Sequence, residues 1–207
     1  MKNKPCAYCG TTDKNLKRTK GHVISHAMYP SNTPHYIQRP TVPECPNCQR
    51  IWTDAETQFM NLLPLASHGN FAARERWQVA LRSFEKTSGP RWFSDLLQPL
   101  VFVTTGDKAT ITAYPARDDS VMLVLRKIIR GLSAYHRIAT AVPDDAVLAD
   151  VLRVPFPAYL QDMLTWHDLG HEFVEYGFEV GSDDTPWSSA WYIQFYERCE
   201  FVALVRR

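Results

Sequence analysis

Two pairs of cysteines near the N-terminus constrain the fold of this chain more than any other feature. Cys6 and Cys9 form one C-x-x-C motif, and Cys45 and Cys48 form a second. Each motif is a tight turn that directs two sulfurs toward one point, so together they supply the four thiolates of a closed tetrahedral zinc site. Such a site has no open coordination position. We therefore expect its metal to hold the fold and to take no part in chemistry.

Disulfide bonds are the alternative interpretation of the same four cysteines. The chain begins MKNK, without an apolar signal segment, which favours a reducing cytoplasm, where paired C-x-x-C motifs are more often metal sites. A thioredoxin-type redox motif needs only one C-x-x-C and would leave the second unexplained. We therefore predict structural Zn²⁺ and a cytoplasmic location. The fifth cysteine, Cys199, is expected to be an ordinary strand residue.

Charge is distributed unevenly along the 207 residues. The first 60 carry eight Lys and Arg against four Asp and Glu, a net charge of +4, which leaves −3 for the remainder of a chain whose overall net charge is +1. A basic patch beside a zinc module favours a phosphate-bearing partner, and a solvated lysine-rich surface is the alternative. The residues expected to contact phosphates are Lys17, Arg18, Lys20 and Arg50.

The region between and after the cysteine pairs has the pattern of a small ββα unit. Residues 17–24 and 36–42 resemble short extended segments, and Thr53 with Glu56 has the capping-box pattern of a helix start. The predicted order over residues 1–64 is therefore knuckle, strand, loop, strand, knuckle and helix.

The remainder of the chain, residues 65–207, is predicted to form a second domain that mixes helices and strands. Helical patterns cover residues 72–84 and 121–135, and shorter helices are expected over 143–152 and 158–166. No apolar run approaches the roughly 20 residues of a membrane-spanning helix, so no membrane association is expected.

Strands of this second domain are predicted from alternating apolar and polar residues. Two of them flank a hairpin turn at residues 105–108, and three more follow near the C-terminus, over residues 174–180, 191–196 and 201–205. We therefore predict an α+β fold, in which a small zinc-stabilised module precedes a mixed helical domain that ends in a three-stranded antiparallel sheet.

The N-terminal motifs resemble those of the HNH endonucleases, which have a ββα-metal fold. The resemblance covers about the first 60 residues and rests on Cys6-x-x-Cys9-Gly10, Gly21-His22-Val23-Ile24, Val42-Pro43-Glu44-Cys45-x-x-Cys48 and Thr53-x-x-Glu56. In that family the strand histidine is the general base, and a neutral imidazole suits this task. The resemblance thus implies an endonuclease that hydrolyses DNA phosphodiester bonds, with His22 activating the water.

The resemblance also implies a catalytic Mg²⁺ or Mn²⁺, and at its ligand positions this chain departs from the family pattern. Gly21 stands where the family has Asp or Glu, and Gln49 stands where it has His or Asn. The family's middle Asn is missing too, since residues 39–41 are Arg-Pro-Thr. The ligands that remain for the catalytic metal are Gln49 with Asp54 or Glu56.

Two other functional classes stay open. A degenerate HNH-derived zinc module that binds nucleic acid or a protein without cleavage is favoured by Gly21. A zinc-stabilised interaction domain unrelated to nucleic acid is favoured by the small total charge. In either case the C-terminal domain is the expected surface for a protein partner or for a second copy of the chain.

Two further histidines are secondary candidates. His26 and His35 lie close to His22 in sequence and are possible substitutes for the missing ligands. The segment HDLGHE, residues 167–172, superficially resembles a zincin helix, but its order is not H-E-x-x-H and Gly170 is expected to end any helix there. We expect no metal at that segment.

Overall fold

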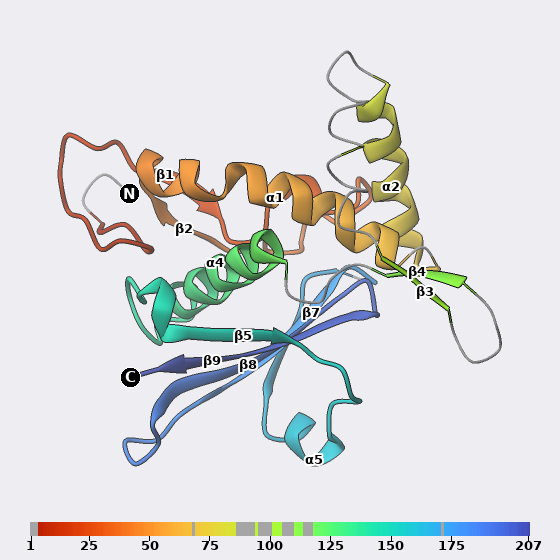
Figure 1. Ribbon diagram of the computed structural model, residues 1–207. Helices are drawn as coiled ribbons and strands as arrows, with labels where there is room; N and C mark the ends of the chain where they lie inside the picture. The colour runs from red at the N-terminus through yellow and green to blue at the C-terminus, as the bar shows by residue number, and fades with distance from the viewer. Residues whose placement is uncertain are drawn as a thin grey trace.

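The described part of the chain combines helices with antiparallel sheets, shown in Figure 1, so the predicted α+β class is confirmed. The computed structural model describes residues 4–67, 69–85, 94, 101–104, 110–113, 118–170 and 172–207. Within these ranges the sheets have two, two and five strands. The N-terminal hairpin and the five-stranded sheet lie on opposite sides of the helix drawn in green in Figure 1.

The N-terminal unit contains a hairpin directly followed by a long helix. Strand β1 (Thr19–His22) pairs antiparallel with β2 (Thr41–Glu44), and helix α1 (Pro46–Ala66) follows. Cys45 is the N-cap of α1, and a proline occupies the first turn, where its missing N–H leaves no hydrogen bond unmade. The predicted order of elements is found, although the second strand begins later than the predicted range of 36–42.

The predicted helix start at Thr53 is wrong, because α1 already begins at Pro46. Thr53 lies in the interior of α1, where its hydroxyl donates to the backbone carbonyl of Gln49 at 2.8 Å. Glu56 makes an ion pair, with its carboxylate 2.6 Å from Nζ of Lys127. Threonine and glutamate three residues apart are compatible with a helix interior as well as with a helix start, since a threonine hydroxyl can also bond within the helix.

The C-terminal sheet has five antiparallel strands, not the three predicted, in the order β5-β9-β8-β7-β6. The predicted strands form its centre, as β7 (Val174–Val180), β8 (Trp187–Phe195) and β9 (Cys199–Arg206). The edge strands are β5 (Val147–Val151) and β6 (Thr165–Asp168). They pair with backbone N–H and C=O groups that a three-stranded sheet would leave open at its edges.

The edge strands correct two helix predictions. The helix expected over residues 143–152 is wrong, because that stretch holds only the short 3-10 helix η2 (Asp144–Ala146) before β5 begins. The helix expected over 158–166 is reduced to α5 (Ala158–Gln161), after which the chain enters β6.

The remaining elements agree with the sequence. Helix α2 (Phe71–Phe84) follows α1, and β3 (Val101–Thr104) pairs antiparallel with β4 (Thr110–Ala113). The predicted turn between these two strands lies outside the described residues. A second 3-10 helix, η1 (His26–Met28), follows β1.

Helix α4 (Asp119–Tyr135) connects the hairpin unit with the five-stranded sheet. Its N-terminus is capped by Asp118, whose carboxylate accepts from the backbone N–H groups of Ser120 and Val121. The helix buries apolar residues together with two cations, Lys127 and Arg130. Buried cations need hydrogen-bonding partners, so α4 can pack in only a limited set of ways.

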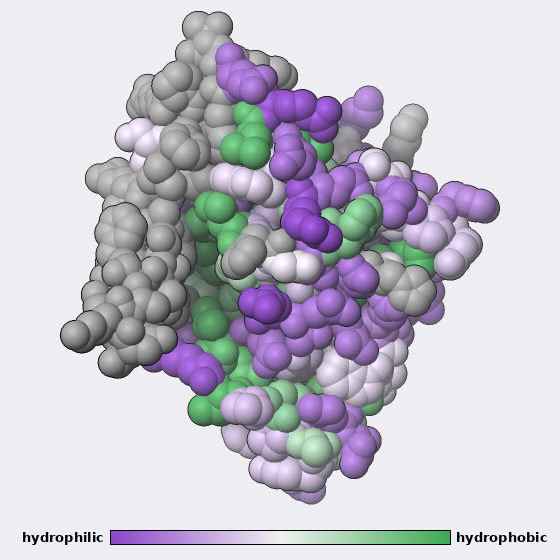
Figure 2. Space-filling view, turned by 90° about the vertical axis from the view of Figure 1, so that its right-hand side faces the viewer, coloured by the Kyte–Doolittle hydropathy of each residue, from purple (hydrophilic) through white to green (hydrophobic). Residues whose placement is uncertain are grey.

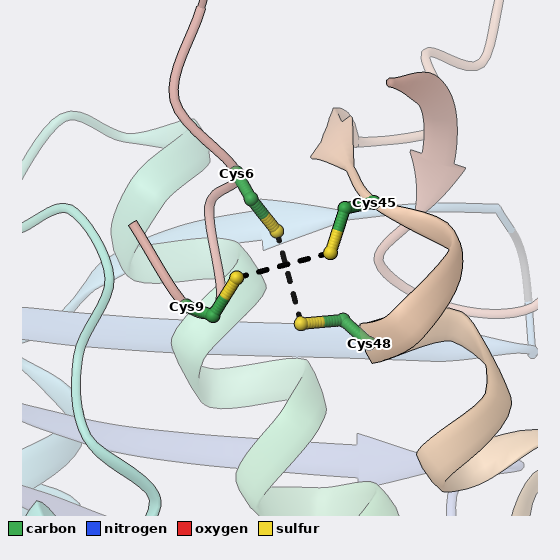
Figure 3. Close-up of side chains that lie close together, drawn as sticks. All are labelled: Cys6, Cys9, Cys45 and Cys48. Carbon is green, nitrogen blue, oxygen red and sulfur yellow. Dashed lines mark hydrogen bonds between the residues drawn. The ribbon is translucent and has the colours of Figure 1, made fainter. Parts of the chain in front are cut away.

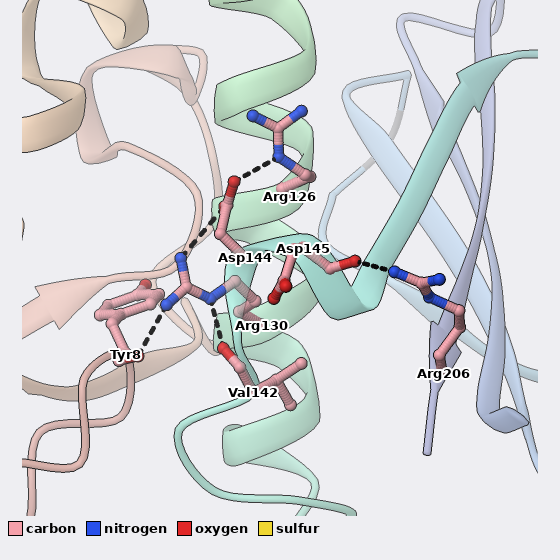
Figure 4. Close-up of polar contacts among 7 residues, drawn as sticks. All are labelled: Tyr8, Arg126, Arg130, Val142, Asp144, Asp145 and Arg206. Carbon is pink, nitrogen blue, oxygen red and sulfur yellow. Dashed lines mark hydrogen bonds and ion pairs between the residues drawn. The ribbon is translucent and has the colours of Figure 1, made fainter.

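Arg130 shows how α4 holds parts of the chain that are distant in sequence (Figure 4). Its guanidinium donates to the backbone carbonyls of Tyr8 at 2.6 Å and Val142 at 2.7 Å, and Nη1 lies 3.2 Å from the carboxylate of Asp144. Arg126, one turn earlier, pairs with the same carboxylate at 2.7 Å. The first cysteine knuckle is thereby tied to the segment that leads into the sheet.

Most buried hydrophobic residues in the described ranges form one cluster that includes both Cys6 and Val205. Helix α1 also runs across residue 64, where the sequence suggested a boundary. The division into domains of residues 1–64 and 65–207 stays a prediction.

One face of the five-stranded sheet is partly hollow. Together with α5 it lines a cavity of about 700 Å³, whose walls include Leu148, Leu160, Met163 and Leu204. Figure 2 shows one face of the molecule, on which hydrophobic residues gather in a band beside hydrophilic ones.

The two arginines of α4 predict a matched pair of stability effects. Arg130→Ala should lower the free energy of unfolding by about 2–4 kcal/mol, because it leaves two carbonyls without their donor. Arg126→Ala removes an ion pair of a side chain that is 27% exposed, and we expect a loss of about 0–1 kcal/mol. Urea unfolding of the two variants checks this, and equal losses would contradict the role assigned to Arg130.

Candidate functional site

The four cysteines of the two knuckles lie together, as predicted (Figure 3). The sulfurs of Cys6 and Cys48 are 3.8 Å apart, those of Cys9 and Cys45 are also 3.8 Å apart, and all four lie within 4.8 Å of one another. Four thiolates at about 2.3 Å from a zinc ion form a tetrahedron whose edges are about 3.8 Å. The cysteines are unpaired and could bind a metal ion such as zinc.

Local backbone contacts hold the two knuckles against each other. The backbone N–H of Ala7 donates to the carbonyl of Pro43 at 2.8 Å, and that of Gly10 donates to the carbonyl of Cys6 at 2.9 Å. Gly10 has a φ of 69°, a left-handed conformation that favours glycine directly after Cys9. The first knuckle is therefore fixed to the end of β2, next to the start of α1.

The electrostatics of the cluster also fit a cation. Burial raises the pKa of the Cys48 thiol far above its usual value. Burial acts in the same direction on Cys6, but backbone hydrogen bonds involving Cys9, Tyr8 and Cys45 outweigh it and lower the pKa of that thiol. Four neighbouring thiolates are compatible only with a bound cation, and binding a divalent metal releases their protons.

Two buried aromatic rings pack below the cysteines, beside a buried carboxylate and two buried cations. The Trp52 side chain is 2% exposed and contacts the ring of Tyr8 edge-on, with centroids 4.6 Å apart. Its indole N–H donates to the carboxylate of Glu44 at 2.9 Å. Trp52 is therefore a core residue and presents no open face for stacking on a base.

His22 lies at the opposite end of the hairpin from the cysteines. It is the last residue of β1 and stands opposite Thr41, whereas Glu44, next to Cys45, pairs with Thr19. At about 3.4 Å per residue the two ends of the pair are about 10 Å apart. The cysteine cluster can therefore stabilise the hairpin without approaching the His22 ring.

The ring of His22 has the properties that a general base requires. It is half-buried, and its Nδ1 is shielded from solvent with no hydrogen-bond partner among the described residues. Burial lowers the pKa of His22, and the nearby charges of His26, Arg39 and Lys127 lower it further. The imidazole is therefore neutral near pH 7 and able to accept a proton.

Two further nitrogen-bearing side chains lie beside His22. The ring of His26 is 5.4 Å from that of His22 between centroids, and the guanidinium of Arg39 donates to Nε2 of His26. Arg39 also lies over the ring of Tyr29, 4.8 Å from its centroid. We call His22, His26 and Arg39 the His22 cluster. Arg39 was missed as a site residue, because only the folded loop brings it next to η1.

The position of the family's acidic ligand is closed in this chain. A Cβ atom added at Gly21 would lie 2.7 Å from the Cβ of Glu44, and the carboxylate of Glu44 fills the space beyond it. Glycine is thus required by the packing. Burial raises the pKa of Glu44, and its carboxylate already accepts from Trp52.

The other predicted metal ligands do not converge either. Glu56 is paired with Lys127, and Gln49 and Asp54 are exposed on α1. In the part of the chain that the structure describes, only the four cysteines bring three or more thiol, imidazole or carboxylate ligands within 4.8 Å of one another. The residues present therefore do not fit a resident Mg²⁺ or Mn²⁺ at the family's position, and we assign no step to one.

The four predicted phosphate contacts fall into two groups. Lys17, Lys20 and Arg50 are exposed, and Arg50 also donates to the side chain of Asn47 at 2.7 Å. Arg18 is 7% exposed and donates to the backbone carbonyls of Thr11, Asp13 and Leu16. Its guanidinium therefore stabilises the loop after the first knuckle and is not open to a phosphate.

His35 and His167 do not belong to the His22 cluster. His35 is exposed, and its ring neighbours that of Tyr36, with centroids 6.1 Å apart. His167 lies in β6, so the zincin-like segment begins in a strand; His171 lies outside the described residues.

Comparisons with known proteins add no family assignment. No protein-family model matches the chain, and no match is found among curated proteins or among solved structures. None of the helices in the described ranges combines the length and the apolar character needed to cross a lipid bilayer.

The cysteine geometry predicts one zinc ion per chain. Cys48→Ser should lose the metal and unfold at lower temperature, because three thiolates hold zinc less tightly and the hairpin loses its anchor. Cys199→Ser is the matched control, since its sulfur contacts the hydroxyl of Ser67 at 3.3 Å and lies outside the cluster. Metal analysis of purified protein measures this. Full zinc content in the Cys48 variant would contradict the assignment.

The Gly21–Glu44 contact predicts that an acidic side chain at position 21 is harmful. Gly21→Asp should destabilise the protein by about 1–3 kcal/mol through overpacking. Glu44→Gly, which removes both the Cβ and the carboxylate, should recover part of that loss when both changes are combined. Thermal unfolding of the three variants measures the coupling. If the two effects simply add, Glu44 is not the residue that excludes a side chain at position 21.

Proposed function

We propose that this chain is an HNH-type endonuclease that hydrolyses phosphodiester bonds of DNA, with His22 as general base and with zinc on the four cysteines. The observation that carries the proposal is the neutral, half-buried ring of His22 at the end of a cysteine-anchored hairpin, directly beside His26 and Arg39. No other histidine in the described ranges stands next to an arginine in this way.

The His22 cluster supplies two of the functions that phosphodiester hydrolysis needs. The neutral imidazole of His22 accepts a proton from the attacking water. Arg39 is a permanent cation that stabilises negative charge developing on the phosphate. Its hydrogen bond to His26 holds the guanidinium within the cluster. The exposed Lys17, Lys20 and Arg50 add the positive charge that attracts a nucleic-acid backbone.

A specific observation also favours a second candidate, a zinc module that binds nucleic acid or a protein without cleaving. Glu56, a candidate ligand for a catalytic cation, is held 2.6 Å from the Lys127 ammonium, and Gly21 is closed off by Glu44. Both features are expected where binding is retained and hydrolysis is lost.

Nicking of supercoiled plasmid separates the two candidates. The purified chain is incubated with the plasmid in parallel reactions with Mg²⁺, Mn²⁺ or EDTA. The wild-type chain should convert the plasmid to the open circle, and His22→Ala should reduce the rate of this conversion about 100-fold or more. His35→Ala is the matched control, because this histidine is exposed and outside the cluster. A zinc-loaded wild type that binds DNA without nicking it would favour the second candidate.

The lowered pKa of His22 sets the pH dependence of the reaction. A general base acts in its deprotonated form, so the rate should rise with pH through the lowered pKa of His22 and reach its plateau at a pH below that of an ordinary histidine. The pH–rate profile of plasmid nicking measures this. A profile that is still rising well above pH 7 would contradict a neutral His22.

A further inference from the structure

Besides the cavity at the five-stranded sheet, the chain has a more polar cavity next to the His22 cluster. This cavity has no part in the function proposed so far. It has a volume of about 540 Å³ and is enclosed by three parts of the chain. The loop before β2 contributes Gln38, the C-terminus of α4 contributes Tyr135, His136 and Arg137, and the sheet contributes Asp168 and Tyr176. We propose that this cavity binds one unpaired nucleotide of a nucleic-acid strand whose backbone contacts the His22 cluster.

The floor of the cavity is aromatic and neutral. His136 Nε2 and the hydroxyl of Tyr176 are 2.9 Å apart, and the ring of His167 is nearly parallel to that of Tyr176, with centroids 5.0 Å apart. Burial lowers the pKa of His136 to about 4 and also lowers that of His167, so both rings are uncharged at neutral pH. A floor of uncharged planar rings suits a planar heterocycle better than it suits an ion.

The rim of the cavity carries the polar groups that a nucleotide needs. Gln38, Arg137 and Asp168 are exposed there. An amide and a carboxylate offer donors and acceptors to the edge of a base, and a guanidinium offers a partner to its phosphate. Tyr135 is 36% exposed, so part of its ring is free for stacking, and its hydroxyl lies 3.5 Å from the side-chain oxygen of Gln38.

The cavity and the His22 cluster are connected through consecutive residues. Gln38 lines the cavity, and the next residue, Arg39, donates to His26, whose ring lies 5.4 Å from that of His22. A phosphate at the cluster would therefore have a neighbouring nucleotide within reach of the rim. Bases of an intact duplex are paired and stacked and cannot enter such a cavity, so the favoured substrate is single-stranded or locally unpaired nucleic acid.

This inference rests on the proposed function, and binding measurements test it separately from cleavage. The 207-residue His22→Ala chain is titrated into a labelled single-stranded 16-mer of DNA and into the same 16-mer as a duplex, and binding is followed by fluorescence anisotropy. Unlabelled 5′-mononucleotides are added as competitors in a third titration. We expect the single strand to bind at least tenfold more tightly than the duplex. Tyr135→Ala should weaken single-strand binding by about 5- to 100-fold, the usual effect of removing a stacking side chain, and should leave duplex binding unchanged.

Tyr159→Ala is the matched control, because Tyr159 is a tyrosine of α5 that is 70% exposed and does not line the cavity. Equal binding of the two DNA forms, or a Tyr135→Ala variant that binds the single strand normally, would overturn the inference and leave the nuclease proposal intact. Mononucleotides that compete at concentrations close to those of the strand would also overturn it, since the occupant would then be a free nucleotide. Absence of binding to both DNA forms would overturn the proposed function and the inference together.

Discussion

The arrangement of the site depends on one buried cation, the ammonium group of Lys127. Its Nζ donates to the backbone carbonyls of His22 at 2.7 Å and Val23 at 3.1 Å, and to the carboxylate of Glu56 at 2.6 Å. An ammonium that is 2% exposed is tolerated only with such partners. Lys127 on α4 therefore determines how the end of β1 lies against α1, and so where the His22 ring is held.

The cysteines and Lys127 restrain the hairpin at opposite ends. The cysteines fix the end at which Glu44 pairs with Thr19, and Lys127 fixes the end at which His22 pairs with Thr41. Between these ends, Glu44 fills the space that a side chain at Gly21 would need. The same packing that makes the hairpin rigid thus removes the acidic ligand expected there, which is why the chemistry we propose relies on His22 and Arg39.

Local chemistry in the sequence predicts part of this structure well. The spacing of the cysteines predicted their cluster, because two C-x-x-C turns supply the four thiolates of a tetrahedral zinc site. Apolar periodicity predicted α4. Tertiary contacts decided the rest. Residues 147–151 become a strand because the edge of β9 pairs with them, and the roles of Arg39 and Lys127 arise from contacts between segments distant in sequence. Neither role has a local pattern from which it could be inferred.

A crystal structure of the His22→Ala chain with a single-stranded DNA oligonucleotide would show whether the His22 cluster holds the substrate. We expect a backbone phosphate beside His26 and Arg39, zinc on the four cysteines, and the scissile bond facing position 22. DNA bound to another surface, such as the hollow face of the five-stranded sheet, would contradict this expectation, as would a phosphate held away from Arg39.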